Sequence, residues 1–407
     1  MKRIVILCDG TWNAAEAARP TNVVRLAQAL APTGADGVAQ VPIYVEGVGT
    51  GRRGVTWFAR LQDRVLGGLL GLGLMENVVE AYRHLVFLHE PGDEVYIFGF
   101  SRGAFTARSL AGFVRFTGLL ARADLALLPE AVRRYAERCD ETPAARQARN
   151  APWRARHSPH VMTDPADAPV YAAHGAHEAV PFEVTFLGVW DTVGSLGVPG
   201  LFTTRPILHR RHAFHDTALS AMVRAARHAV AIDERRRPFL PTTWSNLREL
   251  EAAASAEGRG RPYREEHFPG DHSAVGGGGD RTALASLTLL WVMEGAEAAG
   301  LEFDDRVRAA IAAQGDPFGP LEGNSKPPGG LAGVLSRLFC SDRPDVERLL
   351  DVSVSARVRW AGRAGGQGAY RPPPLAPLEG ELRAWAQGVA QAERAGTAPS
   401  PVPEPVT

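Results

Sequence analysis

The sequence has few cysteines, no excess of charge of either sign and no long apolar run. Three cysteines among 407 residues are too few, and odd in number, for a disulfide framework, which favours a reducing compartment. Lysine plus arginine equals aspartate plus glutamate at 45 each, so no global field favours nucleic acid or an anionic membrane. No segment approaches the roughly 18 consecutive apolar residues of a membrane-spanning helix. These absences predict a cytoplasmic protein that binds no nucleic acid.

The amino-terminal decapeptide MKRIVILCDG has a basic end followed by a short apolar stretch. That stretch ends at Cys8 and Asp9, which makes it too short for the core of a signal peptide. We therefore expect a first β-strand here. Export by a secretion system that needs no signal peptide stays compatible with this sequence.

The apolar residues follow a pattern that predicts an α/β fold. Strand-like and helix-like runs alternate with short connections, which is typical of a mostly parallel, doubly wound sheet with helical insertions. The strands are expected at Arg3–Asp9, Val41–Val45, Glu94–Phe100 and Val184–Trp190, and the helices at Thr21–Ala31, Met75–His89, Arg102–Phe116, Phe214–Val230 and Thr282–Ala299.

The segment YIFGFSRGAFTARSLAGF places a serine between two glycines where an apolar strand meets a helical run. Ser101 therefore lies at an abrupt strand-to-helix turn, which Gly99 and Gly103 are small enough to allow. This is the G-x-S-x-G nucleophile elbow of α/β-hydrolase-like folds, which presents a hydroxyl at the top of the sheet. Because a pentapeptide often matches by chance, the flanking strand and helix are what make the prediction specific.

A nucleophilic serine in this fold is followed along the chain by an acid and then by a histidine. Asp191 is the best candidate acid, because a buried-looking strand, FEVTFLGVW, ends directly before it. Capping of the next turn is its alternative role, and Asp233 and Glu234 are alternative acids. His272 is the best candidate base, since it precedes four consecutive glycines that can approach another segment closely. A plain glycine loop with an incidental histidine is the alternative.

The other histidines carry weaker signals. Six of them lie in arginine-rich stretches and are expected to be solvated or structural: His157, His160, His209, His212, His215 and His228.

An oxyanion hole in such a site needs two backbone N–H groups. Arg102, directly after the nucleophile, is expected to supply the first. Gly10 and Thr11, in the loop CDGTWN after the first strand, are the candidates for the second, with Gly47–Gly51 as the alternative loop. Asp9 has the alternative role of shaping the first loop by accepting backbone hydrogen bonds. This chemistry needs no metal and no organic cofactor.

The chain divides by composition into three parts. Residues 1–310 are predicted to form an α/β-hydrolase-like catalytic domain, in which residues 126–182 are an insertion or cap. Residues 311–375 are expected to be a carboxyl-terminal extension packed on the core. Residues 376–407 are expected to form a helix followed by a proline-rich, disordered tail.

Seven segments carry a more specific pattern: CDGTWN, TNVVRLAQAL, GVGTG, PGDEVYIFGFSRGAFTARSLAGF, LGVWDTVGSLG, ARHAVAIDERRRPFLPTTW and FPGDHSAVGGG. Together they resemble a bacterial and fungal α/β-hydrolase domain family that includes the type VI secretion phospholipase effectors of the first lipase-effector group. The similarity spans Arg3–Leu301 and continues more weakly in SVSARVRWAG and YRPPPL. It implies ester hydrolysis, with phospholipids as substrates of the effector members.

The resemblance also implies specific roles for residues of this chain: Ser101 as nucleophile, Asp191 as acid and His272 as base. The sequence departs from the family pattern at two positions beside the histidine. Asp271 stands where an apolar or small residue is usual, and Ala274 stands where an aspartate is usual. These departures predict a different organisation of the loop that holds His272.

We therefore expect a serine hydrolase that cleaves carboxylic esters, of lipids or phospholipids, through a Ser-Asp-His triad and an acyl-enzyme. Two alternatives stay open. One is a hydrolase-fold binding module without turnover, its pocket closed by residues 126–182. The other is an esterase for small soluble esters or thioesters.

Surface features near the triad suggest how a lipid would be met. An apolar substrate entrance is expected in VGSLGVPGLF, from Leu196, Val198, Leu201 and Phe202; a partly buried loop is the alternative. The basic stretch Arg224–Arg237 is a candidate for transient contact with lipid phosphates, although a charge run is more often a solvated face. A secretion or immunity partner stays open, as does the oligomeric state.

Overall fold

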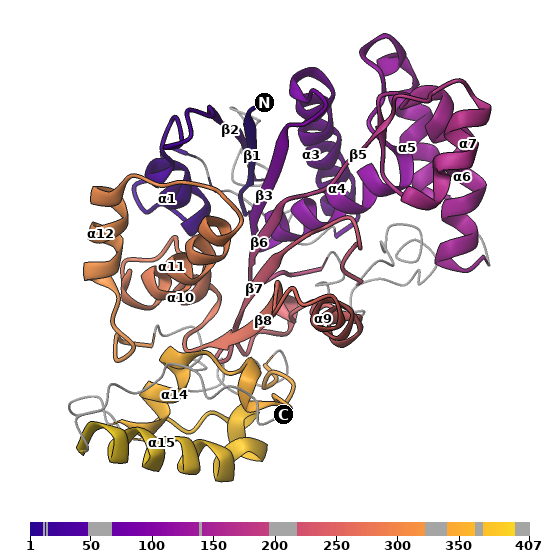
Figure 1. Cartoon of the computed structure of the whole chain (residues 1–407). Helices are drawn as coiled ribbons and strands as arrows, with labels where there is room; N and C mark the ends of the chain where they lie inside the picture. The colour runs from indigo at the N-terminus through magenta and orange to yellow at the C-terminus, as the bar shows by residue number, and fades with distance from the viewer. Residues whose placement is uncertain are drawn as a thin grey trace.

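Six strands form one parallel sheet in the order β2-β1-β3-β6-β7-β8 in a computed structural model of the chain (Figure 1). The structure describes residues 1–10, 13, 15–47, 67–137, 141–194, 218–321, 340–362 and 369–394. The strands are β1 (Arg3–Cys8), β2 (Gln40–Val45), β3 (Glu94–Phe100), β6 (Phe186–Trp190), β7 (Ala226–Ala231) and β8 (Tyr263–Phe268). All five neighbouring pairs run parallel, which confirms the predicted doubly wound α/β architecture.

Helices cover both faces of this sheet (Figure 1). One face carries α1 (Asn22–Ala29), α10 (His272–Gly276), α11 (Ala283–Ala298) and α12 (Asp305–Gln314), and the other carries α3 (Gly67–Leu88), α4 (Arg102–Thr117) and α9 (Leu247–Ala256). The central strands are therefore apolar on both sides. In β1, Ile4 and Ile6 join the core under α3 and α4, whereas Val5 and Leu7 join the core under α1 and α11. This alternation follows from the two-residue period of a strand.

The segment predicted as an insertion or cap forms a helical layer beside α4 (Figure 1). It consists of η1 (Arg122–Leu127), α5 (Leu128–Ala136), α6 (Pro143–His157), β4 (Val161–Met162), η2 (Pro165–Asp167), α7 (Ala168–Ala173) and β5 (Val180–Pro181). Asn150 and the buried Arg154 both donate to the Phe116 carbonyl, at 2.6 and 3.0 Å. Phe116 lies fourteen residues beyond the start of α4, about 21 Å along the helix axis. These contacts fasten the insertion to the end of α4 remote from Ser101.

The described carboxyl-terminal residues form a third layer beside β8 (Figure 1). Its elements are η5 (Leu349–Asp351), α14 (Val354–Ala361), η6 (Pro373–Leu378) and α15 (Glu379–Arg394). Trp360 and Leu382 belong to an apolar cluster that reaches Ile232 on the main domain. The Ser353 N–H donates to the His267 carbonyl of β8 at 3.0 Å, so this layer covers an edge strand. Residues 395–407, the predicted tail, lie outside the described residues.

Most predicted elements are present, but the helix expected at Phe214–Val230 is wrong. Ala226–Ala231 is instead the strand β7, hydrogen-bonded to β6 and β8. Arg227 and His228 gave this segment an amphipathic appearance, yet four of its six residues are apolar and all four are buried. Residues 214–217 lie outside the described part of the chain.

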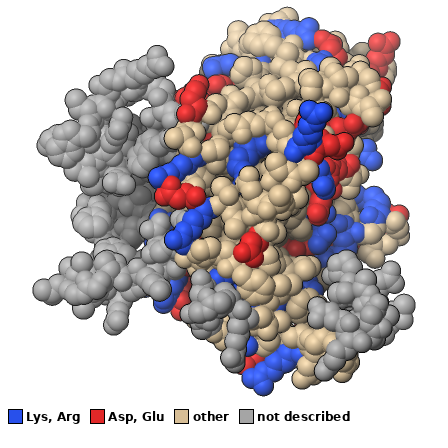
Figure 2. Space-filling view, turned by 90° about the vertical axis from the view of Figure 1, so that its left-hand side faces the viewer, with Lys and Arg blue, Asp and Glu red and all other residues tan. Residues whose placement is uncertain are grey.

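One face of the molecule carries charges of both signs. In Figure 2, lysine and arginine side chains lie among aspartate and glutamate side chains, with uncharged surface between them. The expected basic surface at Arg224–Arg237 is not continuous. Arg227 donates to the Trp291 carbonyl, His228 is fully buried and Arg236 forms an ion pair with Glu234 at 2.6 Å. None of the described helices is both long enough and apolar enough to cross a bilayer.

The close approach of α4 to β1 generates a stability prediction. A β-carbon at Gly103 would overlap the backbone carbonyls of Cys8 and Asp9. We expect Gly103→Ala to lower the free energy of unfolding by about 3 kcal/mol, because backbone must move to make room. Gly388→Ala, on α15 with open space around it, is the matched control and should stabilise by about 0.5–1 kcal/mol. Urea denaturation measures both, and equal midpoints would contradict the packing described.

Candidate active site

Ser101 occupies a strained turn between β3 and α4. Its φ of 58° and ψ of −122° are rare for a residue with a side chain and cost about 1–3 kcal/mol. Its N–H donates to the Trp190 carbonyl at 3.0 Å, which ties the turn to the end of β6. A β-carbon at Gly99 would overlap the Gly103 carbonyl. The expectation that both glycines make room for this turn is confirmed.

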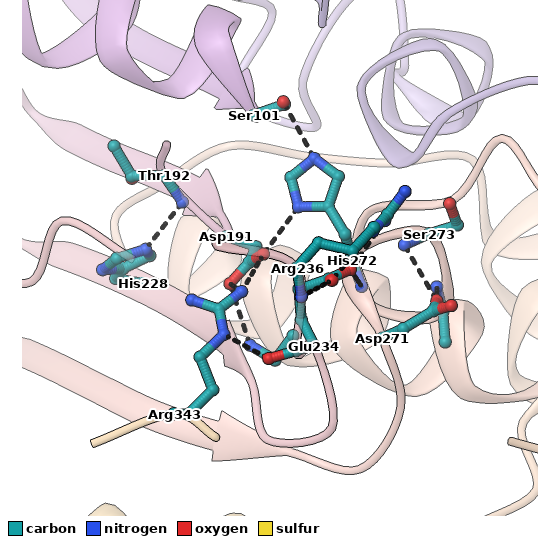
Figure 3. Close-up of polar contacts among 12 residues, drawn as sticks. Ser101, Asp191, Thr192, His228, Glu234, Arg236, Asp271, His272, Ser273 and Arg343 are labelled. Carbon is teal, nitrogen blue, oxygen red and sulfur yellow. Dashed lines mark hydrogen bonds and ion pairs between the residues drawn. The ribbon is translucent and has the colours of Figure 1, made fainter. Parts of the chain in front are cut away.

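Three side chains from distant parts of the chain meet beside this turn (Figure 3). The Ser101 hydroxyl lies 2.8 Å from His272 Nε2, and His272 Nδ1 lies 2.6 Å from Asp191 Oδ2. Because an ionised carboxylate only accepts hydrogen bonds, Nδ1 carries the proton and Nε2 is left to accept from the hydroxyl. A serine oxygen, an imidazole and a carboxylate in this order can make a nucleophile, its base and the group that orients the base.

Asp191 has no exposed surface, yet it carries a charge. It follows β6 directly with φ 34°, and Oδ1 accepts from the Ala231 N–H of β7 at 3.0 Å. Burial by itself would raise its pKa. The charge of Arg343, together with the hydrogen bond and charge of His272, outweighs burial and holds the pKa of Asp191 well below its usual value. The carboxylate is thus ionised at any pH at which the protein would be assayed.

His272 is held between two aromatic rings. The rings of Phe100 and Phe239 lie 4.6 and 4.7 Å from the imidazole, centroid to centroid. The glycines after it allow close packing, as predicted, because a β-carbon at Gly276 would overlap the Phe100 ring. Gly277, at φ 81°, contacts the backbone of α1 near Asn22. The imidazole therefore has little room to leave its position.

The unusual Asp271 organises the loop that holds His272. It is the N-cap of α10, and its Oδ1 accepts from the N–H groups of Ser273 and Ala274 at 3.1 and 3.0 Å. Its Oδ2 is buried and has no partner among the described residues. Burial raises the pKa of Asp271, with a further contribution from the charge of Glu234. The departure from the family pattern thus fixes the backbone directly after the histidine.

The candidate oxyanion groups differ in their surroundings. Gly10 lies beside the nucleophile, since a β-carbon there would be 3.3 Å from Ser101 Cβ. Its N–H donates to Asp9 Oδ1 at 2.6 Å, and Asp9 Oδ2 accepts from Thr21 and Tyr44. Asp9 therefore does shape this loop, the alternative role expected for it. Arg102 opens α4, where Ser101 makes no side-chain cap.

Several predicted residues fall outside the described part of the chain. Thr11 and most of the alternative loop, residues 48–51, are among them. So are the four residues of the expected substrate entrance: Leu196, Val198, Leu201 and Phe202.

The alternative acids lie close to the site but serve other partners. Asp233 accepts from the Gly270 N–H and the Tyr370 hydroxyl at 2.7 and 2.8 Å, and burial raises its pKa to about 6. Glu234 accepts from the backbone N–H of His272 at 3.3 Å and pairs with Arg236. Both carboxylates thus hold the loop around His272. None of these hydrogen bonds joins them to an imidazole nitrogen.

Two groups beside Asp191 carry contacts that sequence reasoning did not specify, although His228 is one of the histidines expected to be solvated or structural (Figure 3). His228 accepts from the Thr192 N–H at 3.1 Å through Nε2, and its Nδ1 lies 2.8 Å from Glu265. Arg343, in the carboxyl-terminal layer, contacts both oxygens of Asp191, at 3.2 and 2.9 Å. No sequence motif marks either position. A histidine in a strand and a polar segment such as SDRPD are both common in sequences.

Comparison with known proteins finds a matching family model and one relative in yeast. A family model described as "T6SS, Phospholipase effector Tle1-like, catalytic domain" matches residues 2–295. A Saccharomyces cerevisiae relative, "Uncharacterized protein YEL023C", is 28% identical over 246 residues, which are 58% of this chain and 32% of the relative. The chain thus spans about a third of that relative's length.

Two solved structures are similar at low sequence identity. The Tle1 effector bound to the VgrG spike of the type 6 secretion system is 19% identical with a TM-score of 0.35, over 68% of this chain and 51% of that chain. An uncharacterized protein from Pseudomonas aeruginosa is 17% identical with a TM-score of 0.40, over 100% of this chain and 60% of that chain.

The cap formed by Asp271 generates a prediction about stability and pH. Asp271→Ala should lower the free energy of unfolding by about 1 kcal/mol, because two N–H groups of α10 lose their acceptor. Asp271→Asn keeps an acceptor and removes a buried charge. The raised pKa of Asp271 means that the folded state penalises ionisation of this carboxyl group. The native protein therefore loses stability as the pH rises from the usual pKa of an aspartate to the raised pKa of Asp271.

Asp271→Asn should therefore be at least as stable as the native protein at neutral pH and lose this advantage in acid. Thermal unfolding at several pH values measures both variants. A native-like Asp271→Ala would show that the cap contributes nothing.

Proposed function

The chain belongs to the Tle1-like phospholipase effector catalytic-domain family of type VI secretion, and from this premise we propose that it is a serine hydrolase of lipid esters in which Ser101 is the nucleophile. The family supports a lipid-ester hydrolase. The observation that carries the finer proposal is the unbroken series of hydrogen bonds from Ser101 through His272 to Asp191, with lengths of 2.8 and 2.6 Å. Ser101, Asp191 and His272 each come shortly after a strand, and all three lie at the carboxyl edge of the sheet.

Acylation begins when Ser101 Oγ attacks the ester carbonyl carbon and His272 Nε2 accepts the hydroxyl proton. Asp191 stabilises the resulting imidazolium through Nδ1 and keeps the ring oriented. When the tetrahedral intermediate collapses, the carbon–oxygen bond to the alcohol breaks and His272 returns its proton to that oxygen. Ser101 then carries the acyl group as an ester.

Deacylation repeats these steps with water. His272 accepts a proton from a water molecule as the water oxygen attacks the acyl carbon, and it then returns the proton to Ser101 Oγ. A free fatty acid leaves when the substrate is a phospholipid, together with a lysophospholipid from the first half of the cycle. His272 carries each proton transferred in this cycle, and the attacking water supplies the proton that restores the Ser101 hydroxyl.

The developing oxyanion needs donors at the start of α4. The N–H of Arg102 is one of the first amides of that helix, which have no intrahelical acceptor and lie at the positive end of the helix dipole. Gly10 lies close enough to be the second donor if its N–H turns from Asp9 toward the oxyanion. Thr11 is the other candidate for that donor. Each such donor is worth about 2.7–4 kcal/mol in the transition state.

The substrate proposal is a phospholipid acyl ester, which follows the family description. Delivery by a type VI secretion system, without a signal peptide, and a secretion or immunity partner belong to the same proposal. The insertion contacts described for Phe116 lie far from the nucleophile, so they give no support to a pocket closed by residues 126–182.

Labelling with a fluorophosphonate probe tests the nucleophile. We expect the native protein to be labelled at Ser101, and Ser101→Ala, Asp191→Asn and His272→Ala each to lower turnover by about a thousandfold or more. Ser255→Ala, an exposed serine on α9, is the matched control and should keep both labelling and turnover. Absence of labelling in folded native protein would overturn the proposal.

Two substrates then separate lipid from soluble esters. Vesicles of a diacyl phospholipid are expected to release fatty acid, as measured by mass spectrometry, and a short-chain p-nitrophenyl ester should be cleaved less efficiently. Cleavage of the soluble ester alone would keep the serine mechanism and remove phospholipid as the substrate class.

A further inference from the structure

The carboxyl-terminal layer reaches the candidate triad through one short segment. Cys340 forms an antiparallel bridge with Arg236, and the Ser341 N–H donates to the Arg235 carbonyl at 2.8 Å. Arg235 and Asp342 add an ion pair at 2.9 Å. This pairing aligns the segment with the loop after β7 and directs the next residue, Arg343, inward.

Arg343 is buried beside Asp191 (Figure 3). Its Nη2 contacts Asp191 Oδ1 and Oδ2 at 3.2 and 2.9 Å, and its Nε donates to the Glu234 carbonyl at 3.1 Å. The guanidinium therefore lies on the side of the carboxylate away from His272. It also bridges Asp191 to the loop whose Glu234 side chain supports the His272 backbone.

We propose that Arg343 is a positioning residue for the reaction, which holds the Asp191 carboxylate in place and sets how strongly it stabilises a protonated His272. This inference rests on the proposed serine hydrolase function. Arg343 lies 48 residues beyond residue 295, where the family match ends, and thus in the carboxyl-terminal layer. The proposal makes residues 340–343 part of the catalytic unit of this chain.

The physical argument concerns one negative charge shared by two cations. Asp191 faces His272 with Oδ2 and the guanidinium with both oxygens, so the positive charge of Arg343 opposes the gain of a second positive charge on the imidazole. Without Arg343, the same carboxylate would stabilise imidazolium more strongly. Labelling of Ser101, which needs His272 as a base, would then be slower in acid.

Other charges lie near His272, and the other arginine among them, Arg236, has its ion pair with Glu234. The charged groups around it among the described residues are Asp191 after β6, Glu234 and Arg236 after β7, Asp271 before α10, and Arg343. Glu234 is paired with Arg236, and Asp271 accepts from α10 amides. Arg343 is the cation with a direct contact to the triad carboxylate in this set.

A pH profile distinguishes the proposed role of the Arg343 charge from a purely structural role of this residue. Arg343→Gln removes the charge and keeps a donor, whereas Arg343→Lys keeps the charge. The matched control is Arg248→Gln, which breaks an exposed ion pair between α9 and Glu347 of the same carboxyl-terminal layer. The rate of fluorophosphonate labelling at Ser101 is measured from pH 5 to pH 9, with unfolding followed by thermal denaturation.

We expect Arg343→Gln to move the acid limb of the labelling profile upward by about one pH unit and to slow labelling at pH 6 about tenfold. Arg343→Lys and Arg248→Gln should keep the limb of the native protein. A folded Arg343→Gln with the native limb would overturn the inference. If Arg343→Gln does not fold, Arg343→Lys decides: a native limb supports the inference, and a limb displaced by a unit despite the retained charge overturns it.

Failure of the proposed function is distinguishable from failure of this inference. If native protein and Ser101→Ala are equally unlabelled, the serine hydrolase proposal fails and the inference fails with it. If native protein is labelled at Ser101 and the acid limb of the labelling profile is the same with or without a charge at position 343, the hydrolase proposal survives. The proposed role of Arg343 then fails.

Discussion

A carboxylate without solvent exposure must be stabilised by protein groups alone, and Asp191 imposes this demand on its surroundings. The imidazole of His272, the backbone N–H of Ala231 and the guanidinium of Arg343 meet it together. These groups come from α10, β7 and the carboxyl-terminal layer. A single buried charge therefore ties three separate layers of the fold to one point at the carboxyl edge of the sheet.

The backbone at this edge is strained in two places, and packing maintains both. Ser101 and Asp191 are the non-glycine residues with positive φ among the described residues. The Ser101 N–H bonds to Trp190, next to Asp191, so the two strained residues support each other across β3 and β6. Strain of this kind costs free energy and persists where surrounding contacts leave no alternative, which is a common property of sites that position reacting groups.

The carboxyl-terminal layer contributes to the candidate site as well as to the fold. The family match ends at residue 295, and the sequence alone places the extension as a layer packed on the outside of the core. The layer does cover β8, and its apolar cluster reaches Ile232. Arg343, which follows its exposed residues Ser341 and Asp342, is buried and places its guanidinium on Asp191, so one layer both covers an edge strand and contacts the candidate site.

Local sequence was sufficient for the features that depend on near neighbours. The alternation of apolar residues, the glycines around Ser101, and the chain order of Ser101, Asp191 and His272 predicted the sheet and the three residues that the fold brings together. Local pattern failed at Ala226–Ala231, where Arg227 and His228 suggested a helix, because burial of those side chains depends on Trp291 and Glu265 far along the chain. Arg343 had no local signal at all, since its role depends on a carboxylate 152 residues away. Periodicity and turn chemistry act between adjacent residues and are written in the sequence, whereas compensation of a buried charge acts through space, so only the folded chain decided which arginine meets Asp191.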